Sequence, residues 1–289
     1  MTQTTSQAMA AFLESITATK HQKEVLVPAR VAKVQEYLED LFSPESDMPF
    51  LKVHLMGSAA KNTVIRPVDD VDTLAVFSNE NWAIWKYQRD SKAFLYRVRE
   101  AYKGVSVQQV GARGQAIRVF FESGGHVDVA PVFEESAGVY LLPNGSGGWM
   151  RTSPLEATSW FLRKHSELNY QLAPTVRLLK AWNRAHSSRL QSFHLETMAA
   201  SCFATLGANR QSALECFFEW APRNLHVADP GGQSGSLSTY LTQSQQEQVL
   251  RSFQLAHARC QLANSFEATG DHQTAKQYWQ QNLGKGFPQ

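Results

Sequence analysis

Hydrophobic positions recur with different periods along the chain, and the change of period predicts two kinds of structure. From Gln22 to Ser43 apolar side chains recur every three or four positions, which predicts a helix with Pro28 near its start, where proline is tolerated. From Leu51 to Phe133 short runs rich in β-branched and aromatic residues predict strands, interrupted by one helix near residues 91–102. The predicted strands cover residues 51–56, 71–77, 105–110, 116–121 and 126–133.

Helical periodicity returns after the glycine-rich segment Asn144–Gly148 and continues almost to the end of the chain. The predicted helices cover residues 154–165, 174–185, 195–205, 213–221, 245–263 and 272–281, and Asp229–Ser236 (DPGGQSGS) is the main break among them. We therefore expect an α+β protein of two lobes with a cleft between them. We expect residues 1–150, including the N-terminal helix, to form the mixed-sheet lobe and residues 151–289 to form the helical lobe.

Composition narrows the class of protein. Hydrophobic residues make up 43% of the chain and aromatic residues 11%, which excludes a disordered or fibrous protein. With 28 basic and 26 acidic residues the formal net charge is +2, which argues against nucleic-acid binding through bulk charge but allows a local basic site. No apolar run approaches the roughly 18–20 residues that span a membrane, and no secretory signal is visible. Three scattered cysteines fit reduced thiols, so we expect a cytoplasmic protein.

Candidate chemistry begins where the first predicted strand ends. Gly57 and Ser58 follow that strand and precede two alanines, an arrangement that lets backbone N–H groups approach a phosphate closely. Asp70 and Asp72 begin the next strand, and because strand residues i and i+2 point to the same face, their carboxylates project together. Adjacent carboxylates repel each other unless a hard cation such as Mg²⁺ lies between them.

Asp128 adds a third carboxylate, between Val127 and Val129 in a predicted core strand, where an unpaired charge is costly. If this strand lies beside that of Asp70 and Asp72, the three acids can hold two Mg²⁺ ions, the arrangement used for in-line phosphoryl or nucleotidyl transfer. Each feature alone also fits a simpler role, namely a structural turn, a solvated cap or an aspartate at a sheet edge. Their occurrence together and in this order favours the metal site.

The order Gly57-Ser58, Asp70-Val71-Asp72 and Asp128 resembles the active-site signature of the DNA polymerase β-type nucleotidyltransferase superfamily. The chain more closely resembles the bacterial cGAS/DncV-like nucleotidyltransferases (CD-NTases), the SMODS-type second-messenger synthases of anti-phage systems. The similarity continues in GGWMRTSP, VRLLKAWNR, SFHLE, DPGG and residues 270–288, so it covers nearly the whole chain after residue 50. It implies a two-lobed polymerase β-like fold with the active site in the cleft. Residues 1–150 would then be the nucleotidyltransferase catalytic lobe, and residues 151–289 the helical lobe that completes the nucleotide pocket.

The resemblance also implies roles for individual residues. Asp70, Asp72 and Asp128 match the catalytic ligands of two Mg²⁺ ions, for which Mn²⁺ is a possible substitute, with Asp128 nearest the attacking hydroxyl. The matching nucleotide-binding positions are Gly57 and Ser58 for the incoming triphosphate, Lys180 and Ser192 for the triphosphate from the helical lobe, Phe193 for base stacking, Arg151 and Thr152 for base reading, and Asp229 as a loop acid near a nucleotide.

The residues themselves leave simpler interpretations open for several of these positions. Lys180 shares a helix face with Arg177 and Arg184, which fits a solvated face as well as a phosphate site. The remaining alternatives are core packing for Phe193, a surface cation–π pair with Trp149 for Arg151, a turn for Asp229, and structural roles for His126 and His194.

The resemblance implies an enzyme that condenses nucleoside triphosphates (NTPs) into a cyclic di- or trinucleotide second messenger for bacterial anti-phage (CBASS) defence and releases pyrophosphate. The segment Arg151-Thr152-Ser153 lacks the asparagine of pyrimidine-preferring relatives, so purine NTPs such as ATP are expected unless Asn183 faces the base. The expected partners are NTPs and a product-sensing effector protein in trans, and the enzyme is expected to be a monomer. No Cys/His cluster matches the zinc thumb of the animal DNA sensor, so the resemblance implies no double-stranded-DNA activator.

Three other classes of function stay open at this point. Another enzyme of the superfamily would transfer NMP to an antibiotic, a protein or an RNA end, and would need that separate acceptor. A binding module without catalysis is disfavoured because all three carboxylates are present. A purely structural protein gives no reason for Asp128 in its valine-rich strand.

Overall fold

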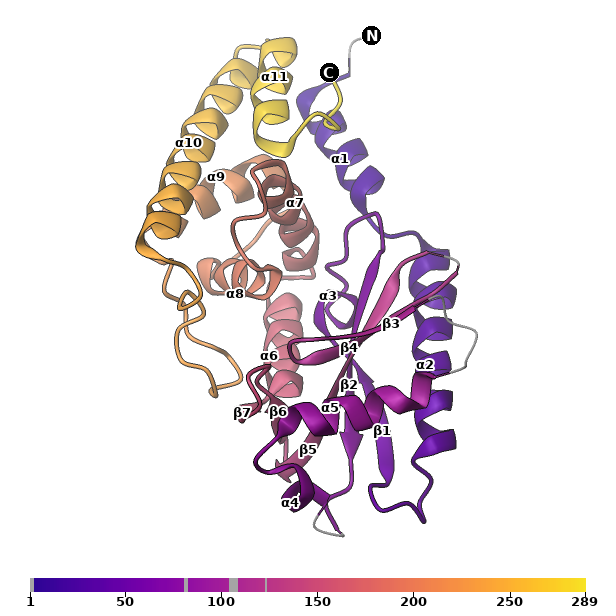
Figure 1. Cartoon of the computed structure of the whole chain (residues 1–289). Helices are drawn as coiled ribbons and strands as arrows, with labels where there is room; N and C mark the ends of the chain where they lie inside the picture. The colour runs from indigo at the N-terminus through magenta and orange to yellow at the C-terminus, as the bar shows by residue number, and fades with distance from the viewer. Residues whose placement is uncertain (1–2, 81–82, 104–108, 123) are drawn as a thin grey trace.

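The computed structural model describes residues 3–80, 83–103, 109–122 and 124–289. It consists of a sheet lobe and a helical lobe (Figure 1), which confirms the predicted α+β class. In these described ranges no helix combines the length and the apolar character needed to cross a membrane.

A seven-stranded mixed sheet forms the sheet lobe. Five strands lie in the order β1-β2-β5-β4-β3, and β6 pairs with β5 and with β7. The central strands β2 and β5 are parallel, whereas the other described pairs are antiparallel. The strands are β1 (Phe50–Leu55), β2 (Asp70–Phe77), β3 (Gln109–Arg113), β4 (Ala116–Phe120), β5 (His126–Ser136), β6 (Val139–Pro143) and β7 (Trp149–Thr152).

Alternation of side chains along the central strands places the acidic residues on one face, which is charged where β2 and β5 begin and apolar further along at Leu74, Val76 and Val132. On β2, Val71, Ala75 and Phe77 enter the core, whereas Asp70 and Asp72 point to the opposite face. Two helices pack on the apolar face, α2 (Val27–Leu41), which continues a π-helical turn at Gln22–Leu26, and α5 (Ser91–Arg99). The charged ends of β2 and β5 are therefore left on the face that looks toward the helical lobe.

Six helices after β7 form most of the helical lobe, and the first helix of the chain joins them. They are α6 (Pro154–Glu167), α7 (Leu172–Ala185), α8 (Ser192–Cys202), α9 (Arg210–Trp220), α10 (Gln243–Ala268) and α11 (His272–Leu283). Helix α1 (Thr5–Ile16) inserts Ala8, Met9 and Phe12 into the core of this lobe. Both termini consequently lie at the same end of the molecule (Figure 1).

The predicted elements after residue 20 are found, with shifted ends and some additions. Helix α8 begins at Ser192 instead of residue 195, and α10 continues to Ala268. The first four residues of the predicted strand 105–110 lie outside the described residues, and β3 begins at Gln109. Further elements that the hydrophobic pattern did not predict are α1, the short helices α3 (Gly57–Ala60) and α4 (Ala83–Tyr87), and the strands β6 and β7. The division at residue 150 crosses β7, and it assigns α1 to the lobe with which its apolar side chains do not pack.

Candidate active site

The turn after β1 places Gly57 against the Asp72 side chain. Gly57 has a φ of +60°, and a Cβ atom at this position would overlap the Asp72 carboxylate. The Met56 N–H donates to the Asp72 carbonyl at 2.8 Å, which fixes the turn to β2. Glycine is therefore required both by the backbone conformation and by the close approach of an acidic side chain.

The three candidate metal ligands lie on two adjacent strands. Parallel pairing aligns Asp72 of β2 with Asp128 of β5, and Asp70 with His126. Antiparallel pairing of β5 with β4 then aligns Asp128 with Arg118. A row of Asp72, Asp128 and Arg118 therefore crosses the charged face, and the predicted adjacency of the two acidic strands is confirmed.

Arg118 holds the Asp128 carboxylate through two hydrogen bonds. Its Nε donates to Oδ1 at 2.8 Å and its Nη2 to Oδ2 at 2.7 Å, a bidentate charge-assisted pair that orients the carboxylate. Arg118 thus competes with a cation for both oxygens of Asp128. Among the residues that the structure describes, no group of three or more His, Cys, Asp or Glu side chains is arranged to bind one ion. Arg118 was not among the predicted site residues, although it lies within the predicted strand 116–121 and pairs in register with Asp128.

The electrostatics of Asp72 nevertheless fit a divalent cation. Burial and, to a lesser degree, the charges of Asp70 and Asp128 raise the pKa of Asp72 to about 6 against the opposing effect of Lys180. A cation between these oxygens would relieve the mutual repulsion and the cost of burial. Carboxylate oxygens are also the ligands that Mg²⁺ prefers in proteins, so the donor set fits the predicted ion.

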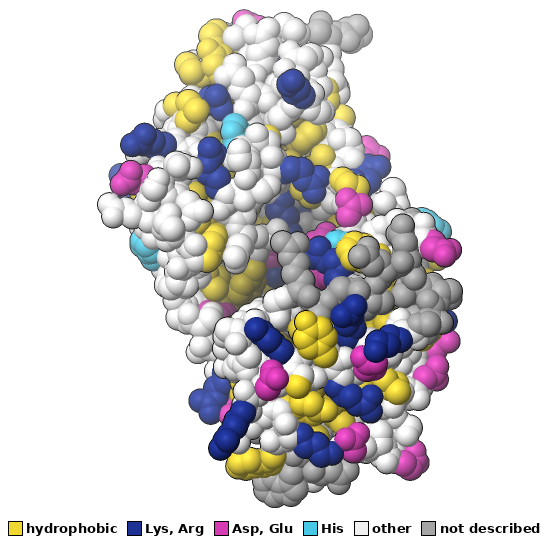
Figure 2. Space-filling view, in the orientation of Figure 1, with side chains coloured by type: hydrophobic (Ala, Val, Ile, Leu, Met, Phe, Trp, Pro, Cys, Tyr) yellow, Lys and Arg dark blue, Asp and Glu magenta, His cyan; other side chains and the backbone are white. Residues whose placement is uncertain are grey.

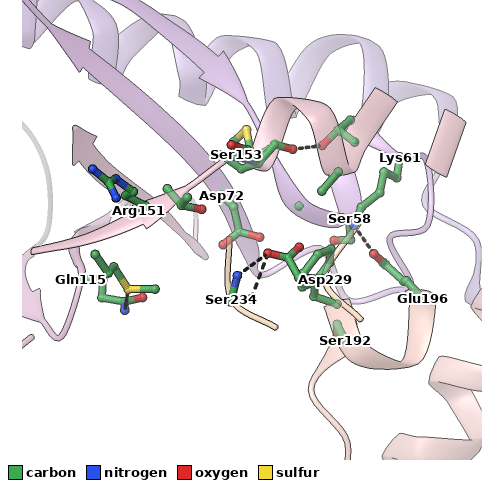
Figure 3. Close-up of a pocket in the computed structure, with 18 of the residues that line it drawn as sticks. Ser58, Lys61, Asp72, Gln115, Arg151, Ser153, Ser192, Glu196, Asp229 and Ser234 are labelled. Carbon is green, nitrogen blue, oxygen red and sulfur yellow. Dashed lines mark hydrogen bonds and ion pairs between the residues drawn. The ribbon is translucent and has the colours of Figure 1, made fainter. Parts of the chain in front are cut away.

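A cavity of about 450 Å³ lies between the lobes, within the size range of small-molecule sites. Figure 3 shows Arg151 and Gln115 of the sheet lobe on one side, Ser192 and Glu196 of the helical lobe on the other, and Asp72 between them. Further predicted site residues that line this cavity are Gly57, Ser58, Asp70, Thr152, Phe193 and Asp229.

Two smaller neighbouring cavities contain the remaining predicted residues. One of about 180 Å³ shares Ser58 and Ser192 with the large cavity and adds Lys180. The other, of about 240 Å³, shares Asp72 with the large cavity and adds Asp128. The structure therefore brings all the predicted site residues together, but distributes them over three adjoining spaces.

A buried cluster of charges joins the two lobes at this site. Glu196 of α8 contacts the Lys61 ammonium and, at 2.5 Å, the Lys180 ammonium of α7. The Thr63 hydroxyl donates to Glu196 Oε1 at 2.5 Å and accepts from Lys180 at 3.2 Å. Burial alone would raise the pKa of Glu196, but the charges of Lys180 and Lys61 outweigh it and lower this pKa to about 2. The interpretation of Lys180 as a solvated helix residue is therefore wrong, because the residue is only 7% exposed.

Lys61 and Glu196 were not identified as site residues from the sequence. Glu196 lies within the SFHLE block, between Leu195 and Thr197, which are both buried. A charged residue in so apolar a helix segment is a signal of a buried partner, but the sequence does not reveal which residue that partner is.

The start of α8 presents Ser192 and Phe193 to the large cavity. The Lys61 ammonium lies 5.0 Å from the centre of the Phe193 ring, a cation–π contact that helps to fix the ring. His194 bonds to the Leu225 carbonyl at 2.8 Å and to the Tyr240 hydroxyl at 3.1 Å. The structural role predicted for His194 is thus confirmed, and it anchors the turn that carries the two site residues.

His126 does not have the satisfied environment that was predicted for it. Its Nε2 is buried without a hydrogen-bond partner and lies 3.9 Å from Asp128 Oδ2. Burial lowers the pKa of His126, which opposes a charged pair with the aspartate. His126 is therefore part of the charged face, beside Asp70, and not a residue with a completed hydrogen-bond network.

Arg151 and Asp229 both reach the cavity rim, but each already has intramolecular partners. Arg151 donates to Glu135 at 2.7 and 2.9 Å, and the Trp149 ring packs with Phe94 and Phe133 instead of with Arg151. The Asp229 carboxylate accepts from the N–H groups of Gly231, Gln233 and Ser234 and from the Ser234 hydroxyl, at 2.9–3.2 Å (Figure 3). Asp229 therefore organises the loop that forms one edge of the cavity.

Carboxylates on adjacent strands, a glycine-serine turn and a nucleotide-sized cavity between two lobes define the class of nucleotidyltransferases. A model of the Second Messenger Oligonucleotide or Dinucleotide Synthetase domain (SMODS) matches residues 2–164, more than half of the chain. The chain belongs to this family of nucleotidyltransferases, as the resemblance predicted.

Individual relatives agree with this assignment. A probable cyclic nucleotide synthase of Bacillus cereus is 24% identical over 268 residues, which cover 80% of this chain and 81% of the relative. A cyclic AMP-AMP-AMP synthase of an Acinetobacter species is 24% identical over 265 residues, 83% of this chain and 74% of the relative. Solved structures of E. coli CdnC share the fold over 98% of both chains, with TM-scores of 0.82 for its complex with HORMA-deltaN, at 22% identity, and 0.81 for its ATP complex, at 21% identity.

Proposed function

We propose that this protein condenses NTPs into a cyclic oligonucleotide in a Mg²⁺-dependent reaction and releases pyrophosphate. The observation that carries this proposal is the alignment of Asp72 with Asp128 beside the Gly57 turn, at the wall of a cavity large enough for a nucleotide. Family membership and the names of the relatives support cyclisation over other uses of the same chemistry.

Some residues of the site would bind metal ions, and others would bind the nucleotide. Asp70, Asp72 and Asp128 would hold two Mg²⁺ ions, which lower the pKa of the attacking hydroxyl and neutralise the departing pyrophosphate. Ser58 and Ser192, which line both the 450 Å³ and the 180 Å³ cavity, bind the triphosphate. In each transfer a bond forms between the acceptor ribose oxygen and the donor α-phosphorus, the bond to the pyrophosphate oxygen breaks, and one proton is released.

We further propose that the substrates are purine nucleotides, with ATP among them. The Asn183 amide donates to the Leu190 carbonyl at 2.7 Å and accepts its N–H at 3.1 Å, so this side chain is engaged away from any base. Asn183 therefore gives no support for a pyrimidine substrate. Phe193 supplies an aromatic surface for the base, and Arg151 and Thr152 lie at the cavity rim to contact its edge.

The biological role that we propose is CBASS signalling, in which an effector protein in trans senses the cyclic product. The relatives include proteins named CBASS oligonucleotide cyclase CdnC. The E. coli CdnC complex with HORMA-deltaN suggests that a protein regulator is a further kind of partner to test. We expect a monomer in the absence of such a partner.

Incubation with the four α-³²P-labelled NTPs tests the proposal. With Mg²⁺, and with Mn²⁺ as substitute, we expect a phosphatase-resistant product whose mass gives the number and kind of bases. EDTA should abolish formation of this product, and nuclease digestion distinguishes 2′ from 3′ linkages. The double variant Asp70→Asn and Asp72→Asn should remain folded and release no pyrophosphate, whereas Asp40→Asn, an exposed position on α2, should behave like the wild type. Label that appears only on an added antibiotic, protein or RNA would instead show transfer to a separate acceptor.

A further inference from the structure

The cations that line the three cavities differ in one respect, namely whether a carboxylate already neutralises them. Lys61 and Lys180 share Glu196, and Arg151 faces Glu135. Arg184 lines the 180 Å³ cavity, and within the described part of the chain no carboxylate lies within ion-pair distance of it. Its recorded contact is a hydrogen bond from Nη1 to the Arg66 carbonyl at 2.6 Å. Most of its donors are therefore available.

The position of Arg184 extends the line of triphosphate-binding residues. It follows Lys180 by four residues on α7, so the two side chains lie on one helix face, separated by about 6 Å along the axis. The 180 Å³ cavity contains both of them together with Ser58 and Ser192, the proposed triphosphate ligands. In Figure 2 Lys and Arg side chains gather on the visible surface where α7 approaches the sheet lobe.

The wall of this cavity is held in place by Asn183. Its side-chain amide exchanges two hydrogen bonds with the backbone of Leu190, and its backbone carbonyl accepts the Ser188 N–H at 2.7 Å. Ser188, with a φ of +48°, is thereby fixed in the left-handed region and lines the cavity near Arg184. Arg184 and Ser188 are exposed at the rim of this cavity, whereas Lys180 and Asn183 are buried deeper in its wall.

We propose that Arg184 binds the terminal phosphates of the incoming NTP in this cavity and makes binding depend on a complete triphosphate. Lys180 is less available for this task, because it is paired with Glu196, which it shares with Lys61, and it donates to the Thr63 hydroxyl. A guanidinium can contact two phosphate oxygens at once, which an ammonium cannot do with the same geometry. The inference rests on the proposed function, since it assigns a ligand within the same site.

Calorimetric titration of the full chain in Mg²⁺ tests this role without turnover. The probes are a non-hydrolysable ATP analogue, AMP and inorganic tripolyphosphate, and the variants are Arg184→Gln, Arg184→Lys and the control Arg251→Gln, an exposed arginine on α10. We expect Arg184→Gln to weaken the binding of the ATP analogue and of tripolyphosphate by about 10- to 100-fold in Kd. This is the range for losing a hydrogen-bonded charge contact. AMP binding should change less than about twofold, and Arg184→Lys should lose less than the glutamine variant because it keeps the charge.

Two results would overturn the proposal. One is an unchanged affinity of Arg184→Gln for tripolyphosphate; the other is an equal loss for AMP, which would mean that Arg184 only fixes the Arg66 backbone. If Arg184→Gln melts well below the wild type, the same comparison is made with Arg184→Lys. Product analysis distinguishes this inference from the proposed function. A wild type that makes no cyclic product contradicts that function, while a selective loss of tripolyphosphate binding still supports Arg184 as a triphosphate ligand.

Discussion

Replacement of Glu196 by glutamine tests how the buried charge cluster holds the lobes together. The substitution keeps the size of the side chain but removes its negative charge, and it leaves the Lys61 and Lys180 ammonium groups facing a neutral amide. Both lysines are almost fully buried, at 4% and 7% exposure. The two positive charges then have no buried counterion between them.

The expected loss of stability is large for a single isosteric change. Removing one partner of a buried ion pair typically costs about 3–5 kcal/mol. At roughly 2–3 °C per kcal/mol for a chain of this length, the melting temperature should fall by roughly 6–15 °C. Glu36→Gln is the matched control, because Glu36 pairs with Lys33 on the exposed surface of α2 at 3.0 Å, and it should shift stability by less than about 1 kcal/mol.

The measurement is thermal unfolding by circular dichroism for the wild type, both glutamine variants, Lys61→Met and the double variant Lys61→Met with Glu196→Gln. The double variant should be more stable than Glu196→Gln alone, since it removes one of the two uncompensated charges. The reasoning is refuted if Glu196→Gln melts within about 2 °C of the wild type. It is also refuted if Lys61→Met and Glu196→Gln are strictly additive, because the two charges would then be independent.

Three further predictions follow from the site. Gly57→Ala should reduce product formation, measured as pyrophosphate release, by about 100-fold or more without unfolding the protein. The reason is that the new methyl group displaces the Asp72 carboxylate. Activity near that of the wild type would contradict this geometry. Phe193→Ala should raise KM for the NTP about 10-fold while kcat changes little, and Phe193→Tyr should restore KM if the ring acts by stacking. Glu196 stabilises the folded state above its unfolded pKa near 4.5, and this contribution is lost as the pH falls toward about 2. Urea unfolding at pH 6, 4 and 3 should therefore show that the free energy of unfolding falls less with decreasing pH for Glu196→Gln than for the wild type.

The acidic face could be predicted because it depends on local alternation. Side chains alternate along a strand, so Asp70 and Asp72 must share the face opposite Val71, even though Leu74 and Val76 bury the rest of that face. The same rule applies to Asp128 between two buried valines. Local alternation could not show that the two acidic strands are neighbours in the sheet; the family resemblance supplied that expectation.

The partners of the charged residues could not be predicted, because they lie far apart in the sequence. Thr63 and Glu196 are separated by 133 residues, and nothing local distinguishes Lys61 or Lys180 from a solvated lysine. Arg118 was missed for a related reason, since its role depends on cross-strand register and not on its own neighbours. These long-range pairings decide which side chains at the site remain available to a ligand.

Helix α1 was missed because its apolar surface is completed only by helices much later in the chain. Ala8, Met9 and Phe12 form a narrow stripe that has no core of its own, and Phe12 packs on Phe287 with ring centres 5.4 Å apart. Strands β6 and β7 are short and are joined by the glycine-rich segment, which hides their alternation.

The placement of α1 also has a mechanical consequence for the enzyme. The chain crosses between the lobes after α1 as well as after β7, and the first crossing is tied to the loop before β2, where the Arg66 N–H donates to the Ile16 carbonyl at 2.7 Å and Thr17 bridges Ile65. A hinge with two separate connections can bend about the line that joins them, but it resists twisting. The two connections and these contacts therefore restrain twisting of one lobe against the other, and they couple the helical lobe to the loop that leads into the acidic strand.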